Sequence, residues 1–301
     1  MLNVYEQVDR NKRRSVIVIV AFFAFVLSIG WLFTRVLGFG PDALVAAFIF
    51  AIVSSFTGYW WGDKIILAST GARPADKKRD FNFFTVAENL SLVAGMPKLN
   101  LYVIDDSSPN AFATGRDPQH ATICATTGLL EKLDRTELEG VVAHEISHIQ
   151  GFDTRLMTIV GVLVGMILLL SDWFLRGAIF RRRDDRDREG NQLQSLLFFL
   201  GIFAIILSPI IAQLIQLAIS RRREFLADAQ GVKLTRFPDG LARALEKISR
   251  DSLPLKQASG ATAHLFIVNP FKKGKVSSFV SNLFATHPPV EERIRILRQM
   301  T

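Results

Sequence analysis

The sequence predicts a mostly helical α+β protein, in which about four transmembrane helices accompany a polar domain with a small β-sheet. Hydrophobic residues make up 49% of the 301-residue chain and the mean hydropathy is +0.26, although 21% of the residues are charged. Such values indicate apolar blocks separated by polar ones. Two blocks, residues 15–34 and 43–62, each hold 20 consecutive uncharged residues. Because about 20 apolar residues cross the roughly 30 Å hydrocarbon layer as a helix, both blocks predict membrane spans.

The N-terminal region, residues 1–62, is predicted to be a transmembrane hairpin. The alternative for the first apolar run is a cleaved signal peptide, because Lys12, Arg13 and Arg14 precede it. That run is longer than the apolar core of a signal peptide, and no small-residue cleavage site follows it before the second run. A membrane anchor is therefore favoured, and the short link at residues 35–42 joins the two spans.

Residues 63–155 have the composition of a polar mixed α/β region. The expected elements are a helix over residues 83–94, short strands over residues 99–104 and 121–126, and a helix that opens at Asp134. Gly95 and Pro97 end the first helix, because neither residue continues a helix readily. Asp134 is followed three residues later by Glu137, a spacing typical of a capping box at a helix N-terminus. We expect this region to form the first part of the functional domain.

Residues 156–220 are predicted to be a second pair of apolar segments. The first of them, residues 156–171, has only 16 residues. As a helix it extends about 24 Å, so it spans the membrane only if the helix continues and Asp172 lies at the interface. The second, residues 195–220, is long enough but contains Pro209, which bends or breaks a helix.

The loop between these segments, residues 176–194, is rich in arginine. Cytoplasmic loops carry an excess of Lys and Arg, which argues for a cytoplasmic loop. If both segments span, however, the loop lies opposite the basic residues of 64–79 and 221–223. Either the loop crosses, with its acidic residues partly offsetting the arginines, or the two segments dip into the membrane without crossing. Both topologies stay open, with spanning preferred.

The net charge of +8 is compatible with either nucleic acid or a membrane surface as partner. Many basic residues lie beside the apolar runs, where they act as orientation signals, so we expect a lipid bilayer and no nucleic acid. Residues 221–301 are expected to be soluble and mostly helical, and to form the second part of the domain. The single cysteine, Cys124, excludes an internal disulfide and a multi-cysteine zinc site, and we expect it to be a small core residue.

Residues 144–148 read His-Glu-Ile-Ser-His, an H-E-x-x-H pattern within the helix that opens at Asp134. Positions i and i+4 share one helix face, so His144 and His148 can bind one zinc ion per chain. Glu145 is then placed to act as general base on a zinc-bound water. If the pattern arose by chance, a buried helix would hold two imidazoles and a carboxylate without partners. The motif beside a small sheet predicts a zincin-like metallopeptidase domain.

A third protein ligand is needed, because catalytic zinc has three protein ligands and an open position. The extended pattern with a third histidine is excluded, because its position is Thr154. Glu224 is the best alternative, with Asp228 one turn later able to accept the second ring N–H of a histidine ligand. From spacing alone, the two could equally form a solvent-facing pair that balances nearby arginines. An even number of crossings separates His148 from Glu224 under either topology, which favours the ligand interpretation.

With these motifs the chain resembles the HtpX-type membrane zinc peptidases, which are distantly related to the CAAX prenyl endopeptidases. The resemblance covers nearly the whole length, including the N-terminal hairpin. Its motifs are VIDDSSPNAFATG at residues 103–115, the pattern at 144–148, REFLAD at 223–228 and THPPVEERI at 286–294. It implies Glu145 as base, Glu224 as third ligand, and Asp228 as the hydrogen-bond partner of a ligand.

The resemblance also implies a setting and a role. The protein would be a multi-pass protein of the bacterial cytoplasmic (inner) membrane, with its active site facing the cytosol. Its substrates would be membrane proteins or unfolded polypeptides, and its role would be stress response through quality control of misfolded or damaged membrane proteins. The chain shows no departure from the family at the metal-site positions.

Two further site assignments follow from the same resemblance. The first is an edge strand that pairs with extended substrate backbone, formed by Asn110, Ala111, Phe112 and Ala113. Its alternative is a buried turn around Phe112. The second is His287 as the group that stabilises the oxyanion of the transition state. Its alternative is a turn residue that precedes Pro288.

The main hypothesis is thus a zinc endopeptidase, and two other functions compete with it. A processing peptidase for prenylated C-termini would need a chamber with more helices than four candidates easily provide. A membrane scaffold with structural zinc would need four protein ligands, usually including cysteine. His120 and His264 have no companions at ligand spacing, so we expect ordinary surface or turn roles for both. Nothing in the sequence indicates an oligomeric state.

Overall fold

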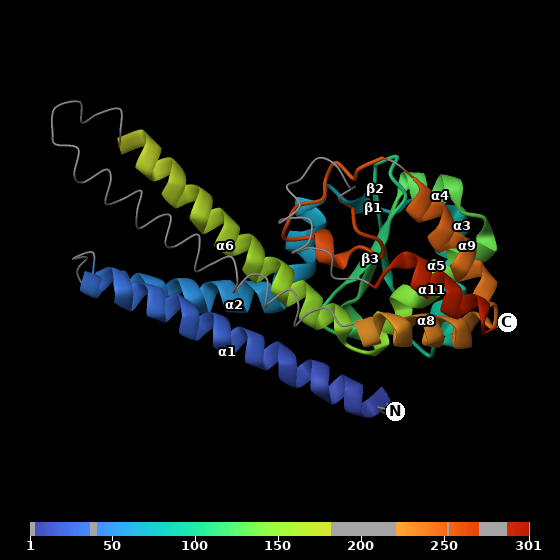
Figure 1. Cartoon of the computed structure of the whole chain (residues 1–301), viewed down its shortest axis with the longest axis horizontal. Coiled ribbons are helices and arrows are strands. Elements are labelled where there is room, and N and C mark those ends of the chain that lie inside the picture. Colours follow the sequence, from blue (N-terminus) through green and yellow to red (C-terminus); the bar gives the residue numbers. More distant parts are fainter. Residues whose placement is uncertain (1–3, 37–40, 182–220, 252, 271–287, 301) are drawn as a thin grey trace.

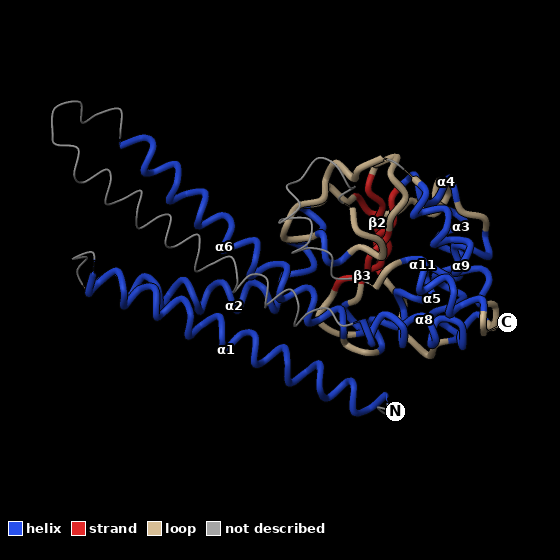
Figure 2. Tube along the Cα trace, in the orientation of Figure 1, coloured by secondary structure: helices blue, strands red, loops and turns tan. Residues whose placement is uncertain are grey.

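The computed structural model describes residues 4–36, 41–181, 221–251, 253–270 and 288–300. Within these ranges the chain is mostly helical and has one four-stranded sheet, so the predicted α+β class is confirmed. Figure 1 shows a rounded domain built around the sheet, and an arm of long helices that extends away from it. Figure 2 places the described strands in the domain and the long helices in the arm.

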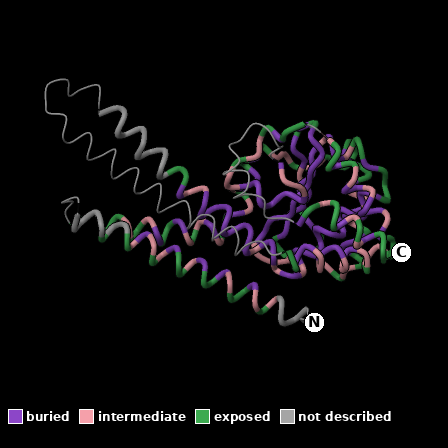
Figure 3. Tube along the Cα trace, in the orientation of Figure 1, coloured by how far each residue is buried: buried purple, intermediate pink, exposed green. Residues whose placement is uncertain are grey.

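The arm consists of α1 (Val4–Val36), α2 (Asp42–Ser69) and α6 (Asp153–Arg181). The first two helices contain the two apolar runs of the predicted hairpin, and Phe23 of α1 meets Phe48 of α2 edge to face. Figure 3 shows that buried and exposed residues alternate along both helices. The large apolar side chains exposed on them include Val16, Ile17, Val20, Trp31, Val45, Phe48, Ile49, Ile52, Val53, Phe56, Trp60 and Trp61. Contiguous exposed apolar surface of this kind marks contact with a membrane or with another protein.

Fewer described helices than expected are long and apolar enough to cross a membrane. Among the described residues, one stretch, Leu44–Ser69 of α2, is long and apolar enough to cross a membrane. A second membrane-spanning stretch is present only if the helices Arg135–Gln150 and Asp153–Leu169, which meet at 83°, form one bent span. The expectation of about four transmembrane helices is therefore not confirmed. The run at residues 195–220 and the loop beyond residue 181 lie outside the described part of the chain.

The sheet has the strand order β1-β2-β4-β3. Its strands are β1 (Arg73–Pro74), β2 (Asn100–Ile104), β3 (Ala111–Thr114) and β4 (Thr122–Thr126). Strands β2 and β4 are parallel, and the other two pairs are antiparallel. The two predicted strands are confirmed as β2 and β4. The segment expected to be an edge strand contains most of β3, which lies at one edge of the sheet.

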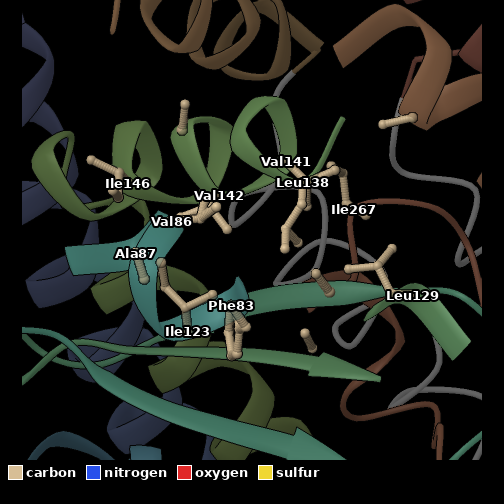
Figure 4. Close-up of a cluster of buried hydrophobic side chains, with 14 of the residues drawn as sticks. Phe83, Val86, Ala87, Ile123, Leu129, Leu138, Val141, Val142, Ile146 and Ile267 are labelled. Atoms are coloured by element: carbon tan, nitrogen blue, oxygen red, sulfur yellow. The ribbon is translucent and has the colours of Figure 1, made fainter. Parts of the chain in front are cut away.

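Both faces of the sheet are covered. One face packs against α3 (Phe81–Val93) and α5 (Arg135–Gln150), and both predicted helices are confirmed. The chain turns after α3 at Gly95, whose φ of 65° favours glycine. Figure 4 shows Val142 and Ile146 of α5 and Val86 of α3 gathered above Ile123 of β4. The opposite face, with Phe112 and Cys124, packs against the base of the arm, so the predicted core position of Cys124 is confirmed.

The described part of the chain after residue 220 is mostly helical, as predicted. It contains α8 (Arg221–Thr235), α9 (Pro238–Arg250) and α11 (Val290–Arg298); α8 and α9 pack against α5, and α11 packs against α9 and α8. Shorter elements are α4 (Thr127–Lys132) and the 3-10 turns η1 (Pro118–His120) and η2 (Ala263–Leu265). The expected domain boundaries at residues 62 and 155 fall inside α2 and α6, so both helices continue from the arm into the domain.

Candidate metal centre

The H-E-x-x-H motif lies on α5, and its helix begins as predicted. The Asp134 carboxylate accepts a hydrogen bond from the Glu137 backbone N–H at 2.9 Å, and the Glu137 carboxylate accepts one from the Asp134 N–H at 2.8 Å. This capping box fixes the start of the helix. Two turns later His144 and His148 lie on the same face, and their Nε2 atoms are 3.2 Å apart. Both imidazoles are almost fully buried, so a partner must satisfy their ring nitrogens.

Glu224 reaches this pair from α8. Its carboxylate oxygens lie 3.8 Å from His144 Nε2 and 3.4 Å from His148 Nε2. The crossing of α8 over α5 is close because Gly231 has no side chain. A Cβ at this position would lie only 3.1 Å from the backbone nitrogen of His144.

The three side chains offer one ligand atom each, and these atoms lie within 4.8 Å of one another. Two ligands bound at about 2.0–2.1 Å to a tetrahedral ion are about 3.4 Å apart. The two Nε2 atoms are 3.2 Å apart, Glu224 Oε1 lies 3.4 Å from His148 Nε2 and Oε2 lies 3.8 Å from His144 Nε2, separations close to those of ligands that share one ion. Two imidazole nitrogens and a carboxylate oxygen form a donor set that suits zinc.

Each histidine also has a carboxylate at its outer ring nitrogen. Asp228 Oδ1 lies 2.9 Å from His144 Nδ1, and Asp153 Oδ2 lies 3.0 Å from His148 Nδ1. A carboxylate at Nδ1 keeps the proton on that nitrogen, so Nε2 can offer its lone pair to a metal. The sequence identified Asp228 for this position but not Asp153. An acidic residue just after the motif, in the first turn of the next helix, was the available signal.

A fully buried arginine that the sequence analysis did not select completes the site. Arg293 of α11 donates to both carboxylate oxygens of Asp228, at 2.9 and 2.7 Å, and lies 3.5 Å from a Glu224 oxygen. It also donates to the Ile267 carbonyl at 3.2 Å. Bidentate arginine pairs are among the strongest charge-assisted contacts in proteins. Arg293 belongs to the THPPVEERI motif, but a single arginine on a short amphipathic helix gives no sign that it is buried.

Charges in the metal-free site are divided unequally between the two histidines. Burial and the positive charge of Arg293 lower the pKa of His144 to about 4. Burial also opposes the charged form of His148, but its hydrogen bond to Asp153 and the Glu224 carboxylate raise its pKa to about 9. Burial alone would raise the pKa of Asp228, but Arg293 and His144 lower it to about 2. His144 is therefore neutral and His148 cationic, so His148 Nε2 can donate its proton to His144 Nε2.

Glu145 lies beside the metal-ligand cluster on the next position of α5. Burial and the neighbouring Glu224 carboxylate raise the pKa of Glu145 to about 7, although His148 acts in the opposite direction. Its carboxylate also interacts with the backbone N–H of Ala113 in β3. A carboxylate with a pKa near neutrality suits a general base.

The edge strand β3 runs next to this base. Residues Asn110, Phe112 and Thr114 face β4, so the backbone groups of Ala111 and Ala113 point to the free edge. The Ala111 carbonyl accepts a hydrogen bond from the Ile267 N–H at 2.9 Å. The strand is thus partly covered by residues 266–268 of the same chain. The alternative of a buried turn around Phe112 is wrong, because this residue lies within β3.

The remaining histidines lie elsewhere. His120 is exposed at the end of η1 and pairs with Asp117, as expected for a surface turn. His264 lies in the turn η2, in line with the expected surface or turn role, but it is fully buried, with its Nε2 3.0 Å from the Met157 carbonyl. The sequence after His264 is apolar, Leu265 to Val268, and this run was the available signal that η2 is buried. His287 lies outside the described residues.

A buried helix with two histidines, a carboxylate ligand from a second helix and an adjacent carboxylate base defines a metal-dependent peptidase. The chain belongs to peptidase family M48, whose family model matches residues 78–301. It is a metalloprotease, a hydrolase of polypeptides. The arm contains a helix long and apolar enough to cross a membrane, which indicates that the protease is membrane-associated.

Relatives from two bacteria extend this similarity over the whole chain. The chain is 44% identical over 302 residues to the "Protease HtpX homolog" of Caldanaerobacter subterraneus subsp. tengcongensis, covering 99% of this chain and 98% of the relative. It is 43% identical over 297 residues to the protein of the same name from Dictyoglomus thermophilum, covering 98% and 94%. Among solved structures it is similar to S. mikatae Ste24p, with a TM-score of 0.47 and 19% identity over 97% of this chain and 67% of that chain.

Proposed function

We propose that the protein is a zinc-dependent integral-membrane endopeptidase that hydrolyses peptide bonds of misfolded or damaged membrane proteins. The observation that carries the proposal is the convergence of His144, His148 and Glu224 around a point beside Glu145. His148 and Glu224 lie on different helices, about 75 positions apart in the sequence, so no local spacing pattern predicts that they meet. A solvent-facing pair formed by Glu224 and Asp228 does not fit their burial.

His144, His148 and Glu224 would hold the zinc ion, one per chain. A bound zinc ion would supply Lewis acidity, which lowers the pKa of a water ligand and polarises the scissile carbonyl. Glu145 takes the proton of the attacking water on its carboxylate and passes it to the leaving amine. Asp228 and Asp153 hold the proton on the Nδ1 atoms of the two histidines, so each Nε2 stays directed at the ion. His287 remains our candidate for stabilising the oxyanion.

The substrate would bind as an extended strand along the free edge of β3. Support comes from the free-edge direction of the Ala111 and Ala113 backbone and from the contact of the Ala113 N–H with Glu145. A substrate strand that ran the full length of β3 would compete with Ile267 for the Ala111 carbonyl. Residues 266–268 would therefore move aside, or the substrate would pair with the Ala113 end of the strand.

The setting we infer is the bacterial cytoplasmic membrane, with several spans and the active site facing the cytosol. Asn11, one residue before the basic group Lys12, Arg13 and Arg14, lies 2.6 Å from Asp153 at the metal centre. Basic residues beside a span favour the cytosolic side, so the metal centre would share that side. Exposed Trp60 and Trp61 lie at the end of the uncharged run 43–62 of α2, and tryptophans in such a position are typical of a membrane–water interface.

The test is cleavage of casein by the full-length protein purified in detergent, with zinc removed by a chelator and then restored. We expect cleavage to disappear with the metal and to return when about one equivalent of zinc per chain is added. Metal-independent cleavage would reject the zinc mechanism. Full zinc binding without any cleavage would favour a scaffold with a structural ion.

A further inference from the structure

We propose that Asn11, on the N-terminal helix of the arm, is a positioning residue for the metal ligand His148 and acts through Asp153. The inference rests on the proposed function, because it takes His148 as a metal ligand. It assigns α1 a part in the active site in addition to anchoring the chain. Neither the metal-binding motif nor the mechanism above uses Asn11.

The contacts form a short chain from the arm to the ligand. Asn11 Nδ2 donates to Asp153 Oδ1 at 2.6 Å, and Asp153 Oδ2 accepts from His148 Nδ1 at 3.0 Å. All three side chains are buried, and Asn11 is only 1% exposed. In a buried environment a hydrogen bond to a carboxylate is worth more than one at a surface, and its loss leaves a group unsatisfied.

Asp153 is held from a second direction by the helix that carries Glu224. Arg223 Nη1 lies 3.1 Å from Asp153 Oδ1 and also donates to Asn11 Oδ1 at 3.4 Å. Oδ1 of Asp153 thus receives two donors from α1 and α8, while Oδ2 is left for His148. With both neighbours in place the carboxylate has one orientation, and this orientation fixes the imidazole ring plane of His148.

The second contact of Asn11 stabilises the corner between α5 and α6. Its Nδ2 also donates to the Gly151 carbonyl at 2.8 Å, one of the groups that a helix leaves unsatisfied at its C-terminus. The next residue, Phe152, has a φ of 57°, which is unusual for a bulky side chain and persists only when its surroundings enforce it. Lys12 of α1 and Arg155 of α6 lie 4.6 and 4.9 Å from its ring centre.

The identity of the residue supports the same conclusion. A membrane anchor does not need a buried amide, which is costly unless it is hydrogen-bonded. Asn11 uses both ends of its amide, the nitrogen for Asp153 and Gly151 and the oxygen for Arg223. Ser15 provides a matched control. It lies one turn further along α1, is buried, and donates within α1 to the Asn11 carbonyl.

The experiment compares full-length wild type, Asn11→Ala, Asn11→Asp and Ser15→Ala in detergent. The zinc dissociation constant is measured by competition with a chelator, and the ligand-field spectrum is recorded after cobalt is loaded in place of zinc. Loss of an outer hydrogen bond to a metal ligand typically weakens metal binding about 10 to 100-fold. We expect a weakening in this range for both Asn11 variants, together with a changed cobalt spectrum, and neither effect for Ser15→Ala.

Three results would overturn the inference, and one of them would also reject the proposed function. Asn11 variants with wild-type affinity and spectrum would show that Asn11 does not position His148. Equal weakening by Ser15→Ala would show that only the docking of α1 matters. If Asn11→Asp does not fold, Asn11→Ala alone decides between these outcomes, because it introduces no new charge. A wild-type protein that binds no zinc would instead reject the proposed function itself.

Discussion

The two nitrogens assigned to the metal face each other across 3.2 Å, close enough for one to donate a proton to the other. The proton belongs to His148, because Asp153 and Glu224 favour its charged form, whereas Arg293 and burial keep His144 neutral. The positive charge of the proton occupies the position that we assign to the metal. The buried carboxylate of Glu224 is thereby balanced before an ion arrives.

Zinc binding at a pH of about 7.5 is therefore expected to release at least one proton. The metal-free pKa of His148 is about 9, so the proton is present at neutral pH and must leave before Nε2 can bind the ion. Lower pH makes it harder to displace, so the zinc dissociation constant should rise about tenfold for each unit of falling pH. Calorimetry in buffers of different ionisation enthalpy counts the proton. Binding without proton release would mean that His148 is already neutral.

The assignment of the third ligand leads to an order of damage among carboxylate variants. Glu224→Gln removes an anionic ligand but keeps size and helix propensity, so the fold should survive with strongly weakened zinc binding. Asp228→Asn should keep zinc with an affinity or activity about 10 to 100-fold lower. Glu139→Gln, the same change at a surface pair with Arg135, is the control. If Glu224→Gln keeps full zinc and full activity, the third ligand lies elsewhere and His287 becomes the candidate.

Among the site residues, the sequence predicts those that lie a few positions apart in one recognisable pattern. His144, Glu145 and His148 form a pattern within two helical turns, and Glu224 with Asp228 forms another. Asp153 and Arg293 have no pattern of their own. Each is a single charged residue whose role depends on which helices meet, and this information is not local in the sequence.

Among the helices, α8 and α11 bring side chains to the metal ligands of α5 from later parts of the chain. α8 contributes Glu224 and Asp228, and α11 contributes the arginine that neutralises them. Removing one partner of such a buried pair costs about 3–5 kcal/mol, because the remaining charge is left uncompensated. A bound cation would provide part of the same compensation. The contribution of α11 to the free energy of unfolding should therefore depend on whether the metal is bound.

Arg293→Met is expected to lower the free energy of unfolding of the metal-free protein by about 3–5 kcal/mol. The zinc-bound variant should lose less, because the ion itself pairs with Glu224. Denaturation of the full-length protein with and without zinc measures both values. Arg298→Met is the matched control, since this arginine lies on the same helix in an exposed pair with Glu246. Equal losses in the two metal states would show that Arg293 is only a packing element.

The elements with strong local signals were predicted well. The capping box at Asp134 and Glu137, and the glycine after α3, mark helix ends through backbone geometry that the sequence encodes directly. The contact of residues 266–268 with the free edge of β3 was not predicted. It depends on Ile267, more than 150 positions from its partner Ala111, and no period or cap records such a contact.

At the scale of the whole molecule, the arm and the domain share one buried contact region. Phe112 and Cys124 of the sheet lie in the same apolar cluster as residues of α1 and α6. The metal centre is thus close to the base of the arm. The sequence predicted that both halves of the site meet on one membrane face, but it could not predict how many helices span. The length and hydropathy of a segment show whether it could span a membrane, but they do not show whether lipid or protein surrounds it.

Cysteine labelling in intact cells tests this topology. Cysteines introduced near residues 70 and 300 should both react from the cytosolic side, because the site needs both segments on one side. A cysteine within the loop at residues 176–194 is expected to react from the other side. The native Cys124 serves as an internal control, since burial raises the pKa of its thiol and it should stay unreactive in the folded protein. Labelling of positions 70 and 300 from opposite sides would separate Glu224 from the two histidines.

We assign Glu145 as the base beside a metal ion that other residues hold. The most direct measurement is zinc content together with casein cleavage for wild type and Glu145→Ala, both purified full-length in detergent. This assignment predicts about one zinc per chain in both proteins and no detectable cleavage by the variant, because the base is lost while the ligands remain. Less than about half a zinc per chain in Glu145→Ala, or cleavage at the wild-type rate, would contradict it.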